Sequence, residues 1–85
     1  MAPEAEQLRL LVVDDEPKLT EFLRMELEVE GYAVDVVHDG ASGLIALRGE
    51  PAPDLVLLDW NLPDFTGLDI CRRIRATGMT VPVLM

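Results

Sequence analysis

The sequence predicts an α/β fold in which helices cover a parallel β-sheet. Short apolar segments alternate with amphipathic ones in the order β-α-β-α-β-α-β, and this order requires right-handed crossovers between parallel strands. The 85 residues allow one small domain, and a hydrophobic content of 49% is sufficient for a core. No internal repeat or low-complexity segment interrupts the alternation.

The first predicted strand leads into a helix with well-marked ends. Leu8–Val13 is almost continuously apolar, as expected of a strand buried on both faces. Pro17 suits the first position of a helix, with Asp15 or Glu16 as its N-cap, and Gly31 is expected to end it. Apolar residues recur at helical spacing within this segment and should face the sheet: Leu19, Phe22, Leu23 and Leu27.

The middle of the chain predicts two strands around a short helix. Ala33–Val37 is rich in β-branched valine and is read as the second strand. An Asp-Gly turn then leads into a helix over Ala41–Arg48. Asp54–Leu58 is the third strand, and its uninterrupted Leu and Val residues place it at the centre of the sheet.

The last elements are a third helix and a fourth strand. The helix begins at Gly67 or Leu68 and ends at Gly78, and Val81–Met85 begins the fourth strand. Residues 1–7 are polar and are read as a flexible leader. The apolar residues of the third helix are expected to point inward: Leu68, Ile70, Cys71 and Ile74.

Composition limits the partners that we expect. The formal net charge is −9, and only Arg72, Arg73 and Arg75 form a basic group, so direct nucleic-acid contact is not expected. No apolar run approaches the ~20 residues of a membrane helix, and the acidic N-terminus lacks the layout of a signal peptide. The single cysteine, Cys71, fits a reducing, cytoplasmic setting.

Three aspartates follow two of the buried strands directly. The apolar run 10–13 leads into Asp14 and Asp15, and the run 55–58 leads into Asp59. In open α/β sheets the functional site lies beyond the carboxyl ends of the strands. If these strands are neighbours, the carboxylates meet there, where they repel one another unless they take up a proton or bind a divalent cation.

Oxygen ligands of this kind suit Mg²⁺, which commonly binds one or two carboxylates together with water and phosphate. Asp14, Asp15 and Asp59 can supply carboxylate oxygens, and a main-chain carbonyl in the Trp60–Asn61 turn can supply another. Asp59 ends the most central strand and is the better candidate for a nucleophile that attacks phosphorus. The ion would neutralise charge that develops on the phosphoryl oxygens.

The same residues carry a family resemblance. Val12-Val13-Asp14-Asp15-Glu16-Pro17 and the segment 53–69, in which Asp59 is followed by Leu62-Pro63 and then Gly67, resemble the receiver domain of bacterial two-component response regulators. The similarity extends over residues 8–85 with the family's spacing. The helix that begins near Leu68 is most similar to that of OmpR/PhoB-type transcription regulators.

The resemblance implies a fold, a reaction and a partner. The fold would be flavodoxin-like (CheY-like), with three layers and the strand order 2-1-3-4. Asp59 would accept a phosphoryl group from a sensor histidine kinase, and Mg²⁺ would be held by Asp14, Asp15, Asp59 and the main-chain carbonyl of Asn61. The chain would be a fragment of a DNA-binding transcriptional regulator and no enzyme, beyond self-catalysed phosphotransfer and dephosphorylation.

The resemblance also implies a difference at the end of the chain. Receivers continue past the fourth strand with a Ser or Thr, a Lys after the fifth strand, and a last helix, and these positions would fall beyond Met85. We therefore expect 8–85 to be the N-terminal part of a receiver domain that lacks the fifth strand and the last helices. An unpaired edge at Val81–Met85 predicts a homodimer, formed by edge pairing or domain swapping.

Simpler explanations and other functions remain open at this point. An Asp-Asp pair before a proline is often only a helix cap, and a lone Asp such as Asp59 can cap a loop. A receiver-like module that acts through protein contacts without phosphorylation is the main alternative function. A small phosphatase is disfavoured because no second acid or base is visible beside Asp59.

Overall fold

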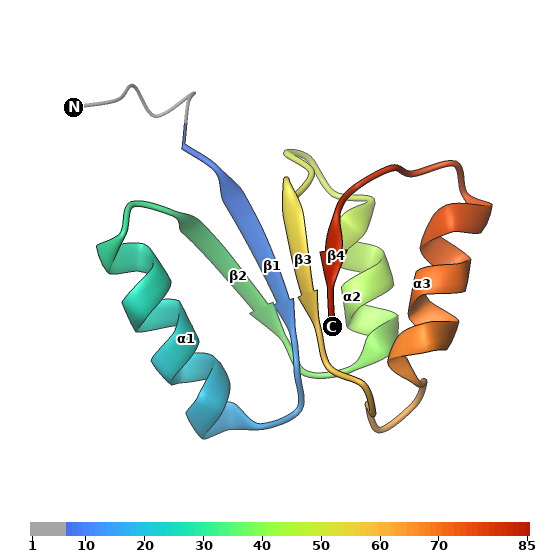
Figure 1. The fold of residues 1–85 in the computed structure, drawn as a ribbon, viewed down its shortest axis with the longest axis horizontal. Coiled ribbons are helices and arrows are strands. Elements are labelled where there is room, and N and C mark those ends of the chain that lie inside the picture. Colours follow the sequence, from blue (N-terminus) through green and yellow to red (C-terminus); the bar gives the residue numbers. More distant parts are fainter. Residues whose placement is uncertain (1–6) are drawn as a thin grey trace.

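The computed structural model describes residues 7–85 and confirms the α/β class (Figure 1). Residues 1–6 of the predicted leader 1–7 lie outside the described residues, and Gln7 is exposed with its side-chain amide donating to the Gly31 carbonyl at 3.0 Å. Within 7–85, no helix has both the length and the apolar character needed to cross a membrane. The elements are β1 (Arg9–Val13), α1 (Pro17–Val29), β2 (Ala33–Val37), α2 (Gly40–Leu47), β3 (Leu55–Leu58), α3 (Gly67–Ala76) and β4 (Val83–Leu84).

The sheet has the predicted topology. Its four strands are all parallel and lie in the order β2-β1-β3-β4. The register aligns Val13 with Val37 on one side and with Leu58 on the other. Strands β1 and β3 therefore end at the same level, and the residues that follow them, Asp14 and Asp59, leave the sheet side by side.

The helices form layers on both faces of the sheet. Figure 1 shows α1 on one side and α2 and α3 on the other. The residues of β1 from Leu10 to Val13 are each at most 5% exposed, as predicted for a strand covered on both faces. The larger core lies on the α2 and α3 face and contains Leu11, Val13, Leu47, Val56, Leu58, Ile70 and Ile74.

The α1 face is packed more loosely than the sequence predicts. Leu19 and Phe22 were expected to face the sheet, but they are 43% and 60% exposed. Leu23 and Leu27 are half-buried beside the sheet. An open cavity of about 400 Å³ lies between α1 and the sheet. Its apolar lining residues are Leu8, Leu10, Leu27, Leu55, Leu57 and Leu84.

The glycines that end two helices are as predicted, whereas β4 begins at Val83 instead of Val81 and one side chain of α3 points elsewhere than expected. Gly31 and Gly78 follow α1 and α3 with positive φ angles of 97° and 84°, as expected of residues that end helices. Ile70 and Ile74 are buried, but Leu68 is 50% exposed and the prediction that it points inward is wrong. Leu68 lies two residues from Ile70, which is about 200° around a helix of 3.6 residues per turn.

Candidate metal and phosphoacceptor site

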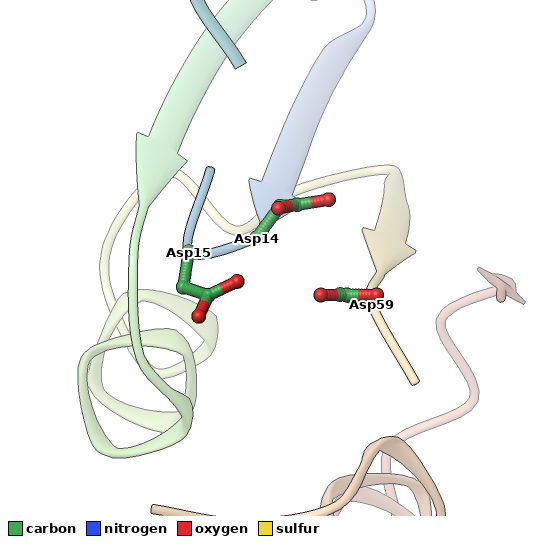
Figure 2. Close-up of side chains that lie close together, drawn as sticks. All are labelled: Asp14, Asp15 and Asp59. Carbon is green, nitrogen blue, oxygen red and sulfur yellow. The ribbon is translucent and has the colours of Figure 1, made fainter. Parts of the chain in front are cut away.

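The structure brings the three predicted aspartates together at the carboxyl ends of β1 and β3. One carboxylate oxygen from each of Asp14, Asp15 and Asp59 lies within 4.8 Å of the other two. Figure 2 shows the three side chains around a common space. Asp14 and Asp59 are half-buried, and Asp15 is exposed. Three carboxylates at this separation are a suitable ligand set for a hard divalent cation.

Backbone N–H groups orient two of these carboxylates. Asp14 Oδ1 accepts a hydrogen bond from the N–H of Glu16 at 2.9 Å. Asp59 Oδ1 accepts one from the N–H of Trp60 at 2.8 Å. Glu16 is the N-cap of α1, as predicted, but its side chain makes no capping hydrogen bond. The side chains are thus fixed by their own loops, with lone pairs remaining for an ion or a phosphorus atom.

The segment 59–67, which we call the site turn, folds back on itself after Asp59. The N–H of Gly67 donates to the Trp60 carbonyl at 2.7 Å, and the N–H of Leu62 donates to the Phe65 carbonyl at 3.0 Å. Asn61 and Thr66 lie opposite each other between these two bonds. In such a non-hydrogen-bonded pair, each residue's own N–H and C=O point away from the partner. The Asn61 carbonyl is therefore not used by the turn, and its role as a metal ligand stays a prediction.

Gly67 allows the site turn to close against the end of β3. A Cβ atom at this position would lie 2.6 Å from the Asp59 carbonyl oxygen and 3.3 Å from Trp60 Cα. Both are backbone atoms, so a side chain would have to displace the main chain at the site. The glycine in the family-like motif therefore has a steric reason in this chain.

Asp64 is a residue whose role sequence reasoning missed. It lies at the tip of the site turn, and its carboxylate accepts from the N–H groups of Gly40 at 2.7 Å and Ala41 at 2.9 Å. Desolvation raises the pKa of Asp64, but hydrogen bonds from the backbone N–H groups, first that of Ala41 and then that of Gly40, lower it below its ordinary value. The contact spans 24 residues of sequence, so no local signal could have revealed it.

His38 also contacts the site, although no sequence pattern indicates a role for it. Its side chain is exposed directly after the end of β2. The ring Nδ1 lies 2.9 Å from the Asp14 carbonyl oxygen. His38 thus contributes to holding the β1 end in place, through the main chain of Asp14.

Space for a substrate lies directly beside the carboxylates. An open cavity of about 270 Å³ is lined by Asp14, Asp59 and Trp60 together with apolar residues of α1, β3 and β4. Trp60 is 63% exposed at its rim. The cavity is large enough for a phosphoryl group and reaches the side chain that would accept it.

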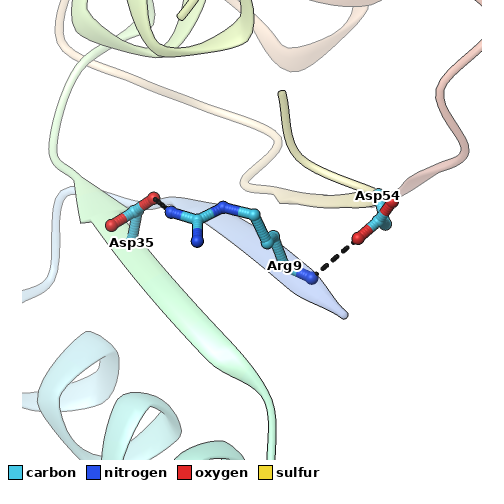
Figure 3. Close-up of polar contacts among 3 residues, drawn as sticks. All are labelled: Arg9, Asp35 and Asp54. Carbon is cyan, nitrogen blue, oxygen red and sulfur yellow. Dashed lines mark hydrogen bonds and ion pairs between the residues drawn. The ribbon is translucent and has the colours of Figure 1, made fainter. Parts of the chain in front are cut away.

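Arg9, at the opposite end of the sheet, has two aspartate partners of a different kind. Arg9 lies between Asp35 on β2 and Asp54 before β3 (Figure 3). Its guanidinium lies 3.4 Å from Asp35 Oδ2, and its backbone N–H donates to Asp54 Oδ2 at 2.8 Å. The N–H of Asp54 in turn donates to the Arg9 carbonyl at 2.7 Å. These carboxylates fix β1 between its two neighbours.

Comparison with known proteins identifies the family. Residues 10–85 match the profile of the response regulator receiver domain. The chain belongs to this family. The receiver domain is 49% identical over 77 residues to the DNA-binding response regulator MtrA of Mycolicibacterium smegmatis, with 91% of this chain and 33% of MtrA covered.

Solved structures of response regulators agree with the fold. The receiver domain is similar to the response regulator TrrA of Thermotoga maritima in complex with Mg²⁺ and BeF, with a TM-score of 0.77 and 39% identity over 84% of this chain and 61% of that chain. A second match is the crystal structure of the histidine kinase ThkA in complex with TrrA. Its TM-score is 0.81 and its identity 36%, over 91% of this chain and 66% of the matched one.

The receiver domain spans about a third of the length of the curated relatives that it matches. The family and the CheY-like fold are thus confirmed, together with the predicted strand order 2-1-3-4. The roles of Asp14, Asp15, Asp59 and Asn61 remain predictions that the geometry makes specific.

Proposed function

We propose that this receiver domain accepts a phosphoryl group on Asp59 from a sensor histidine kinase in a Mg²⁺-dependent reaction. The observation that supports the proposal is the group of three carboxylate oxygens within 4.8 Å of one another at the ends of adjacent strands. Asp14, Asp15 and Asp59 would hold the ion, with the Asn61 carbonyl as a further ligand. The complex of TrrA with the histidine kinase ThkA supports a kinase as partner. The complex of TrrA with Mg²⁺ and BeF supports Mg²⁺ as the bound ion.

The chemistry requires little more than positioning. A carboxylate oxygen of Asp59 attacks the phosphorus atom of a phosphohistidine, a P–O bond forms, and the P–N bond breaks. The electron pair of that bond goes to the imidazole nitrogen of the kinase, which takes up a proton from solvent. When bound by the three aspartates, Mg²⁺ would neutralise charge on the phosphoryl oxygens. The receiver's own contribution to catalysis is limited to this transfer and to the later hydrolysis of the aspartyl phosphate.

Labelling with acetyl phosphate tests this proposal without a known kinase. We expect Mg²⁺-dependent incorporation of phosphate into the chain, and we expect Asp59→Asn to abolish it. Asp69→Asn is a matched control, since Asp69 lies in α3 beside Arg72 rather than in the carboxylate group. A chain that takes up no label would contradict the proposal and favour the alternative, a receiver-like module that acts through protein contacts alone.

The proposal also concerns the whole protein to which this domain belongs and the compartment in which it acts. The relatives are DNA-binding or transcriptional regulatory proteins, and we propose that this receiver is part of an OmpR/PhoB-type regulator. Residues 8–85 would not contact DNA themselves, in line with the net charge of −9. The reaction would take place in the cytoplasm, where the free Cys71 stays reduced.

Self-association of the 85-residue chain is a further part of the proposal. Strand β4 lies at the edge of the sheet; its Leu84 is 58% exposed and the following Met85 is 47% exposed. Such an edge can pair with a second copy or exchange its strand with one. We expect light scattering to detect a dimer that Leu84→Lys disrupts. A chain that is monomeric at every concentration would contradict this part of the proposal.

A further inference from the structure

We propose that Asp64 is a positioning residue for the metal site. By holding the tip of the site turn against the first turn of α2, it fixes the Asn61 main-chain oxygen where Mg²⁺ would use it. The inference rests on the proposed function, because it concerns the same ion. The inference adds Asp64 to the residues on which the metal site depends, although Asp64 would not contact the ion itself and lies on the far side of the turn.

The site turn is held at two places, and Asn61 lies between them. At its base, the hydrogen bond from Gly67 to the Trp60 carbonyl joins the turn to the end of β3. At its tip, Asp64 Oδ1 and Oδ2 each accept a separate N–H of α2, from Gly40 and Ala41. The position of the Asn61 carbonyl therefore depends on both attachments.

The tip of the site turn packs closely against the start of α2. A Cβ atom at Gly40 would lie 2.7 Å from the Phe65 ring, 2.8 Å from Ile70 Cδ1 and 3.0 Å from Asp64 Oδ1. Helix α2 thus begins with a glycine where the site turn approaches most closely. The close contact and the two hydrogen bonds together define one position for the tip.

Displacement of this tip should weaken the binding of Mg²⁺ more than the binding of larger cations. Mg²⁺ requires near-octahedral ligands at about 2.0–2.1 Å, so a small shift of one ligand is costly. Groups that orient metal ligands without contacting the metal typically change its affinity by about 10–100-fold when they are removed. Asp64 is such a group if it acts through Asn61.

A second capping residue of α2 provides a control that distinguishes a displaced site turn from a less stable helix. Asp39 is the N-cap of α2, and its side chain accepts from the N–H of Ser42 at 2.7 Å. Asp39 and Asp64 therefore both satisfy N–H groups in the first turn of the same helix. Only Asp64 connects that helix to the site turn. Asp39→Asn is accordingly the matched control for Asp64→Asn.

The experiment measures Mg²⁺ binding by calorimetry and amide hydrogen exchange on the 85-residue chain, with circular dichroism to confirm the fold. We expect Asp64→Asn to weaken Mg²⁺ binding about tenfold, Asp64→Ser to do so at least as much, and Asp39→Asn to leave it close to wild type. Without Mg²⁺, the amide protons of Leu62 and Gly67 should exchange faster in the Asp64 variants only. Acetyl phosphate labelling of Asp64→Asn should be slow at low Mg²⁺ and recover at saturating Mg²⁺.

The possible outcomes distinguish this inference from the proposed function. If the wild type binds Mg²⁺ and the Asp64 variants bind it equally well, the inference alone is overturned. Equal weakening by Asp39→Asn and Asp64→Asn would also overturn it, since the common cause would be the stability of α2. A wild type that binds no Mg²⁺ would overturn the proposed metal site and this inference with it.

Discussion

The two ends of the sheet carry the same residue type in opposite electrostatic situations. At the amino end, Arg9 has two carboxylate partners: its backbone N–H donates to Asp54, and its guanidinium reaches Asp35 in the middle of β2. At the carboxyl end, Asp14, Asp15 and Asp59 lie within 4.8 Å of one another. Figures 2 and 3 show the contrast.

Structural and functional carboxylates can be told apart by the partners that they have. The hydrogen bonds at the amino end join strands, so losing a carboxylate there should reduce the stability of the fold. At the carboxyl end, the three negative charges repel one another in the absence of a cation. Losing one of them should therefore cost function while relieving repulsion.

Gly67→Ala should have the largest effect, and it should act at the carboxyl end only. The added Cβ would lie 2.6 Å from the Asp59 carbonyl oxygen, and overpacking of this kind costs about 1–3 kcal/mol. We expect the free energy of unfolding to fall by that amount in urea, with loss of acetyl phosphate labelling. Gly49→Ala is a control, because its nearest contact, Ala46 O at 3.3 Å, lies away from the site. Normal labelling of Gly67→Ala would show that the turn tolerates displacement.

Mg²⁺ should reverse the relative stability of the wild type and Asp59→Asn. Without Mg²⁺, Asp59→Asn removes repulsion on the order of 1 kcal/mol and should be the more stable protein. At 100 times its dissociation constant, a ligand stabilises the protein that binds it by about 2.7 kcal/mol, so the wild type should then be more stable. Thermal unfolding with and without Mg²⁺ checks this reversal. Equal responses of both proteins to Mg²⁺ would mean that Asp59 is not part of the ion's site.

Asp54→Ala should destabilise the chain whether or not Mg²⁺ is present. The substitution leaves the Arg9 N–H without its acceptor, and loss of one such hydrogen bond costs about 1 kcal/mol. Asp35→Ala should cost less, about 0–1 kcal/mol, because the Arg9–Asp35 pair is exposed to solvent. Urea unfolding measures both. If Asp54→Ala stabilised the chain, as expected of Asp59→Asn, the contrast between the two ends would be wrong.

The sequence allowed the carboxyl-end site to be predicted because it depends on simple features. Two apolar runs that each end in aspartate, together with a strand order that places them side by side, are enough to bring Asp14 and Asp59 together. The register of Val13 with Leu58 then follows from the parallel pairing. Gly31 as the end of α1 was equally local and was predicted.

Other features depend on contacts that the chain makes across space. Asp64 looked like an ordinary turn residue, since its partners Gly40 and Ala41 lie more than 20 residues earlier. Leu19 and Phe22 have helical spacing but remain exposed, because periodicity does not reveal how closely a helix approaches its sheet. Sequence reasoning therefore found the residues that could bind an ion, but not the residue that holds their turn in place.

Asp64 lies near the carboxyl end, yet hydrogen-bond donors compensate its charge, as they do for the aspartates that contact Arg9. Its pKa in the folded chain is lowered from 3.8 by backbone N–H groups that outweigh desolvation. A lowered pKa contributes stability that is present above pH 3.8 and is lost as the pH falls through the folded-state value. The neighbouring charged groups are Asp39 at the α2 N-cap and Arg73, whose guanidinium lies 4.6 Å from the centre of the Phe65 ring.

We therefore expect Asp64→Asn to be less stable than the wild type at neutral pH, by the smallest margin of the four predictions because the carboxylate is exposed to solvent. The difference should disappear only as the pH falls below the folded-state pKa, which lies under 3.8, because the wild-type carboxyl is then protonated and resembles the amide. Thermal unfolding of both proteins over this pH range measures it, and Asp39→Asn reports separately on the α2 N-cap. If the loss of stability in Asp64→Asn were the same at every pH, the charge of Asp64 would not contribute to stability. The conclusion that backbone N–H groups compensate this charge would then be wrong.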